Sequence, residues 1–178
     1  MKYETIDEIY AGNDKARARL KEVVASLPDE TATALPAGEK WTVAQIVEHI
    51  SMVDEGAMRI CARLLRKAQE AGQTHDGKVV ITENFLQKGT EIAGMKVQAP
   101  DIVQPTGTKS ISDSLAKLDE NSEQLESLRE LFKSVDGTEL KFPHPFFGDI
   151  SAQEWLALKG GHERRHTKQI ENVLAKIK

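Results

Sequence analysis

Apolar residues recur every three or four positions along four stretches of the chain, the spacing of one face of an α-helix. Each stretch opens with Thr or Ser, followed three residues later by Glu, Gln or Asp, and in this pattern the two side chains satisfy each other's backbone amides. The patterns predict four helices, which begin at Thr5, Thr42, Ser110 and Ser151. Their expected ends lie near Pro28, Gly72, Gly137 and the carboxyl terminus.

Four amphipathic helices, with little chain left for a sheet, predict an all-α protein built as a four-helix bundle. The short connection Leu27–Trp41 makes the first two helices antiparallel neighbours. The connection Gly72–Lys109 is much longer and carries a short helical pattern around Ile81–Lys88. Because it is long enough to cross the bundle, we expect the second and third helices to run parallel. Residues 136–150 are expected to form a loop, and residues 1–178 a single domain.

Composition and charge exclude several classes of protein. Lys and Arg total 24 against 28 Asp and Glu, and the net charge of −4 lacks the basic character of a nucleic-acid-binding protein. Cys61 is the only cysteine, which rules out an intrachain disulfide and a cysteine-rich zinc site. No stretch approaches the ~20 apolar residues of a transmembrane helix, and the first residues show no secretory signal. We therefore expect a cytoplasmic protein that acts on a small molecule, with neither nucleic acid nor membrane as partner.

Three of the five histidines occupy positions where the apolar stripes predict Leu or Ile. His162 and His166 are four residues apart on the fourth predicted helix, so both rings lie on one face, one turn apart. His49 interrupts the stripe of the second helix in the same way. A single inward histidine is more often a hydrogen-bonded core residue than a metal ligand.

Three such residues change that balance, because each buried imidazole nitrogen left without a partner costs roughly 1–3 kcal/mol. A divalent metal would take a lone pair from each ring. The sequence therefore predicts a metal site at His49, His162 and His166, with three core histidines as the alternative. Gln169, three residues after His166, is a candidate for orienting that ring.

The segment His162–His166 also matches His-Glu-x-x-His, in which zinc proteases use the Glu as general base. The rest of the protease pattern is missing, since Gln169 and Asn172 stand where one form requires Gly and His. We therefore do not expect a protease. Glu163 remains a candidate catalytic proton-transfer group beside the metal, and its alternative is a solvated carboxylate.

Four basic residues form a local cluster on the fourth helix: Lys159, Arg164, Arg165 and Lys168. A solvated helix face is the favoured interpretation of this cluster. Arg165 lies nearest the flank of the two histidines and is a candidate for meeting an anionic substrate.

Two segments of the chain resemble motifs of the DinB/YfiT-like superfamily, a group of DinB-like four-helix-bundle metalloenzymes. The second predicted helix opens with WTVAQIVEHI (Trp41–Ile50), and the last is preceded and formed by HPFFGDISAQEWLALKGGHERRHTKQI (His144–Ile170). The amino-terminal helix fits by its pattern alone. The resemblance implies a bundle in up-down-down-up order. It also implies one divalent metal, zinc or nickel, held by His49, His162 and His166 with an open position for water or substrate.

The resemblance leaves the reaction open. It favours a thiol-dependent S-transferase, in which the metal activates a low-molecular-weight thiol cosubstrate toward a small electrophile. One alternative is a metal-dependent hydrolase with Glu163 shuttling protons, and another is a stress-associated small-molecule-binding protein without turnover. Because many bundles of this family look dimeric, a homodimer is a further expectation.

Overall fold

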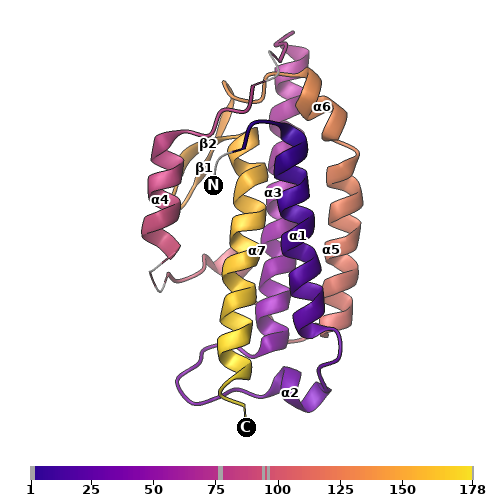
Figure 1. Ribbon diagram of the computed structural model, residues 1–178, viewed down its shortest axis with the longest axis vertical. Coiled ribbons are helices and arrows are strands. Elements are labelled where there is room, and N and C mark those ends of the chain that lie inside the picture. Colours follow the sequence, from indigo (N-terminus) through magenta and orange to yellow (C-terminus); the bar gives the residue numbers. More distant parts are fainter. Residues whose placement is uncertain (1–2, 76–77, 94, 96, 178) are drawn as a thin grey trace.

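The computed structural model describes residues 3–75, 78–93, 95 and 97–177. Four long helices lie side by side and confirm the predicted bundle (Figure 1). They are α1 (Ile6–Val24), α3 (Val43–Glu70), α5 (Ile111–Glu126) and α7 (Ala152–Leu174). α1 and α7 run in one direction along the bundle, whereas α3 and α5 run in the other (Figure 1). None of the helices over the described residues combines the length and apolar character needed to cross a bilayer.

The predicted caps set where these helices begin. At Thr42, Ser110 and Ser151 both hydrogen bonds of the capping box are present, so three of the four expected boxes form completely. At Thr5 the hydroxyl accepts from the Glu8 amide, but the Glu8 carboxylate accepts from the amide of Glu4 instead. The helix starts therefore follow from local sequence.

Two elements differ from the sequence prediction. The third predicted helix is divided into α5 and α6 (Arg129–Ser134), because the chain turns at Leu128 and directs Phe132 into the core against Tyr10. Residues 136–150, expected as a loop, contribute most of a hairpin. Its strands β1 (Lys141–His144) and β2 (Gly148–Ser151) pair antiparallel.

Shorter elements fill the connections. α2 (Asp29–Thr33) lies between α1 and α3, where no helix was predicted. The long crossover contains α4 (Glu83–Ala93), which overlaps the predicted short helix, and the 3-10 turn η1 (Asp101–Val103). η1 rests against α3, and this contact brings the backbone carbonyl of Val103 beside His49.

The apolar core has two halves with a polar layer between them. One half includes Ile9, Leu65 and Phe132, and the other is formed around Leu20 and Ile46. Charged and polar side chains at the intermediate level are also buried: Asn13, Arg17, Ser51, Asp54, Asn121, Lys159 and Glu163. Burial of the two apolar halves explains why the helices associate. In the layer between them, each buried charge needs a partner of opposite charge, because an unpaired buried charge is costly.

Candidate metal centre

The facing sides of α3 and α7 bring the three predicted ligands together. His49, His162 and His166 each offer a ring nitrogen, and the three nitrogens lie within 4.8 Å of one another. His49 and His166 are buried, whereas His162 is partly exposed. The described residues contribute no fourth His, Cys, Asp or Glu to this group.

Hydrogen bonds on the far side of two rings determine which nitrogen faces the group. The Nδ1 of His49 lies 2.7 Å from the carbonyl oxygen of Val103 in η1. The Nδ1 of His166 lies 2.7 Å from Oε1 of Gln169, which confirms the role expected for that residue. Because both oxygens only accept, each Nδ1 carries the proton and each Nε2 presents a lone pair. Metal-binding histidines are oriented in this way in proteins generally.

The distances suit a divalent metal. The Nε2 atoms of His49 and His162 are 3.2 Å apart. Two nitrogens at the ~2.0–2.1 Å bond length of a tetrahedral zinc site would be about 3.3 Å apart. Three neutral imidazoles also form a donor set that zinc and nickel both accept. The residues therefore fit the ion that the sequence implies.

One part of the sequence argument is wrong. Buried imidazoles were expected to lack partners without a metal, yet His49 and His166 have protein partners at both ring nitrogens. The Nε2 of His166 accepts from Nη1 of Arg165 at 3.1 Å. The convergence of Nε2 atoms, rather than unsatisfied nitrogens, is what supports a metal site.

The electrostatics keep the three rings neutral. Burial lowers the pKa of all three, and it lowers that of His166 to about 3. The positive charge of Arg165 acts in the same direction on each of them. At neutral pH the lone pairs are therefore available to a metal without prior loss of a proton.

This arrangement predicts that acid destabilises the metal-free protein. In the unfolded chain a histidine binds a proton near its ordinary pKa of 6.5, whereas folded His166 has a pKa of about 3. The unfolded state therefore binds more protons between these values, and the free energy of unfolding falls as the pH drops below about 6.5. We expect His166→Gln to flatten this dependence in urea denaturation of chelator-treated protein between pH 7.5 and 4.5. An unchanged slope in the variant would contradict the assignment.

Glu163 does not join the three histidines. Its side chain is 1% exposed, so the solvated-carboxylate alternative is wrong. Its Oε1 accepts from Nε of Arg17 at 2.6 Å, and its Oε2 lies 3.3 Å from Nη2 of the same residue. Both carboxylate oxygens are thus bound to a cation from α1. The proton-transfer role stays a prediction, and it would require this ion pair to open.

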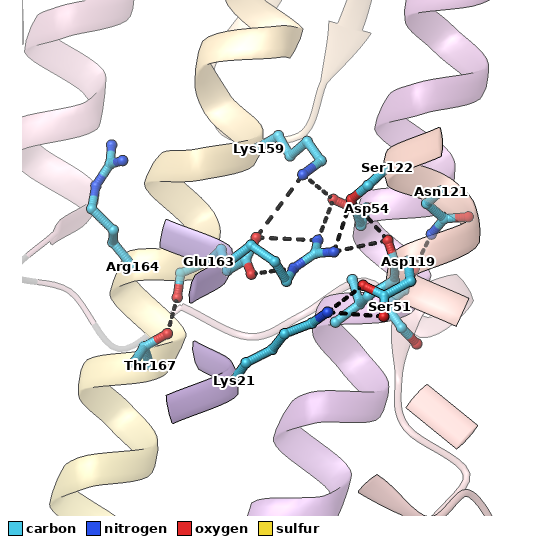
Figure 2. Close-up of polar contacts among 12 residues, drawn as sticks. Lys21, Ser51, Asp54, Asp119, Asn121, Ser122, Lys159, Glu163, Arg164 and Thr167 are labelled. Atoms are coloured by element: carbon cyan, nitrogen blue, oxygen red, sulfur yellow. Dashed lines mark hydrogen bonds and ion pairs between the residues drawn. The ribbon is translucent and has the colours of Figure 1, made fainter. Parts of the chain in front are cut away.

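Glu163 belongs instead to the polar layer, which Figure 2 shows between the helices. Lys159 forms an ion pair with Asp54 at 2.9 Å, and Asp54 is also 3.4 Å from Arg17. Arg17 donates in addition to the carbonyl of Leu118 at 2.8 Å. The expectation that Lys159 lies on a solvated face is wrong, because its inward side chain meets Asp54 across the α3–α7 contact and is buried.

The contacts of His144 lie within and beside the hairpin. Its Nδ1 accepts from the amides of Phe146 and Phe147 at 3.1 and 3.3 Å, and its ring packs on Trp155 with centroids 5.2 Å apart. Burial lowers the pKa of His144 to about 4, so the ring is neutral and holds the hairpin turn.

A narrow cleft adjoins His162 between α3 and α7. Its walls are mainly apolar and include Ile50, Val53, Trp155 and Leu158. Asp54, Lys159 and Glu163 of the polar layer also line it. The space inside it is about 10 Å³, enough for a single water molecule.

Sequence reasoning missed two parts of this arrangement. Val103 orients His49 through its backbone carbonyl, which carries no signal in the sequence. Arg17 and Asn13 had a signal, because they interrupt the apolar stripe of α1 between Ile9 and Leu20. Polar residues at inward positions on α1 would have indicated a buried partner.

Comparison with known proteins identifies the family. Residues 13–170 match the sequence profile of the DinB superfamily. The chain belongs to the DinB superfamily. The curated relative YuaE of Bacillus subtilis (strain 168), an uncharacterised protein, is 26% identical over 169 residues, and the match covers 92% of this chain and 96% of YuaE.

The fold of this DinB superfamily member also matches a solved structure. TT2238, described as a four-helix bundle protein, superimposes with a TM-score of 0.59 and 24% sequence identity. The match covers 94% of this chain and 98% of that one. At this level of identity the likeness shows a shared fold.

Proposed function

We propose that this chain is a metal-dependent S-transferase, which joins a low-molecular-weight thiol to a small electrophile. The observation that carries the proposal is the convergence of three imidazole nitrogens, which lie within 4.8 Å of one another with no fourth protein ligand among the described residues. Three histidines with an open position are typical of catalytic rather than structural metal sites. A divalent ion held there, zinc or nickel, would lower the pKa of a coordinated thiol so that the thiolate forms near neutral pH.

The surroundings favour thiol transfer over hydrolysis. Attack by water is assisted by a group that removes and returns protons, and the candidate for that role, Glu163, is held by Arg17. Attack by a thiolate needs no such base. The sulfur forms a bond to the electrophilic carbon, the leaving group departs with its bonding electrons, and the thiol proton passes to solvent.

The test compares two reactions of the zinc- or nickel-loaded protein. We expect it to accelerate the reaction of a thiol with 1-chloro-2,4-dinitrobenzene, followed by absorbance, and to leave p-nitrophenyl acetate unhydrolysed without thiol. His166→Ala should reduce the first rate to that of the thiol alone, because it removes a ligand. His75→Ala is the matched control, because His75 lies against Gln153 and outside the three-histidine group.

The opposite pattern would contradict the proposal. Ester cleavage that is independent of thiol and lost in His166→Ala would indicate the hydrolase. Tight binding of a small molecule with neither activity would indicate a binding protein.

A further inference from the structure

Arg165 is placed to contact whatever binds at the open side of the histidine group. It lies on α7 between His162 and His166, and its side chain is partly buried. Its Nη1 is 3.1 Å from Nε2 of His166, the nitrogen whose lone pair a metal would take. Its Nη2 donates to the carbonyl of Met95, beyond the end of α4, at 3.4 Å. The guanidinium therefore lies between the candidate metal centre and the crossover segment.

The charge of Arg165 has no counterpart in the described part of the chain. No carboxylate of residues 3–75, 78–93, 95 or 97–177 forms an ion pair with it, and its two partners are neutral acceptors. Arg17, by contrast, is paired with Glu163 and Asp54. A partly buried cation without an anion is unfavourable, and a metal at the histidines would add positive charge beside it.

We propose that Arg165 binds a carboxylate of the substrate while the neighbouring sulfur occupies the metal's open position. This inference rests on the proposed thiol transfer and narrows its cosubstrate to a small thiol that carries a carboxylate. A guanidinium is suited to this task because its planar fork matches both oxygens of a carboxylate. The bonds to Met95 and His166, both with neutral acceptors, would be exchanged for bonds in which the donor and the acceptor are both charged.

Equilibrium binding tests the pairing without turnover. The protein is loaded with Co²⁺ and titrated with 3-mercaptopropionate and with 3-mercapto-1-propanol, and the sulfur-to-cobalt absorption band reports each affinity. We expect the preference of the wild type for the carboxylate ligand to fall about tenfold or more in Arg165→Gln. Any direct binding of the carboxylate to cobalt is common to both proteins, so it cancels in the comparison.

Arg164→Gln is the matched control. Arg164 has the same charge and is adjacent in sequence, but its Nη1 donates to the carbonyl of Gly12 on α1 at 3.4 Å. We expect this variant to keep the wild-type preference. A loss in Arg164→Gln as large as in Arg165→Gln would overturn the inference, because it would show a general effect of charge.

The remaining outcomes separate the two proposals. Equal preference in wild type and Arg165→Gln, or equal weakening of both ligands, overturns the role of Arg165 and leaves thiol transfer standing. An Arg165-dependent preference in a protein that transfers no thiol supports the role of Arg165 and contradicts the proposed reaction. A protein that takes up no cobalt contradicts the metal centre, and this inference falls with it.

Discussion

Replacing His162 with alanine is expected to lower the affinity for a divalent metal by more than about a hundredfold. Loss of a residue that merely orients a ligand already costs about 10- to 100-fold, and His162 is itself one of the three converging donors. Its Nε2 lies 3.2 Å from that of His49, so the variant leaves two donors and a gap between them. Metal content per chain, measured by mass spectrometry on protein purified without an affinity tag, checks the expectation.

Two controls make this result specific. His75→Ala should retain the metal, because His75 lies outside the three-histidine group. Circular dichroism of His162→Ala should match the wild type, because the ring is partly exposed and its loss removes little of the core. If His49→Ala, His162→Ala and His75→Ala all kept the same metal content, the three histidines would not form one site.

The positions of the histidines could be predicted because their signals are local. The capping boxes fix where α3 and α7 begin, and the 3.6-residue period then fixes which side chains face inward. His49 and the pair His162 and His166 follow from that rule once α3 and α7 are neighbours. The family motifs point to the same three residues, since they include all of them.

The elements that sequence reasoning missed depend on contacts across the chain. The turn at Leu128 carries no Gly or Pro, and it forms because Phe132 is buried against Tyr10 of another helix. The hairpin pairs Phe142 with Ile150 through a segment whose prolines favour a loop. Local propensity favours a different structure in both cases, and packing overrides it.

The polar layer connects the fold with the candidate site. Glu163 follows His162 directly in α7, so the two side chains point to different sides of the helix. When α7 is turned so that Glu163 reaches Arg17 of α1, His162 faces His49 of α3. One turn further along α7, the hydroxyl of Thr167 donates to the backbone carbonyl of Glu163. We infer that the ion pairs set the rotation of α7 against α1 and α3, which two apolar core halves would specify less strictly.

Replacing Arg17 with methionine is expected to destabilise the fold by about 3–5 kcal/mol, because breaking a buried ion pair leaves its partner's charge uncompensated. Arg17 is 7% exposed and contacts Glu163 at 2.6 Å. With Lys159 and Asp54 the layer holds two positive and two negative charges, so the variant leaves one negative charge in excess. Urea denaturation measures the loss, and Arg19→Met, whose ion pairs are on the surface, should change stability by less than about 1 kcal/mol.

The double variant Arg17→Met with Glu163→Gln distinguishes charge balance from lost packing. Glutamine removes the excess negative charge and leaves Lys159 paired with Asp54 at 2.9 Å. The double variant should therefore be more stable than Arg17→Met alone, and the effects of the two substitutions should not add. If the second substitution destabilised the protein further by its full single-variant amount, the charges would act independently. The polar layer would then contribute through its hydrogen bonds to groups such as the Leu118 carbonyl rather than through its ion pairs.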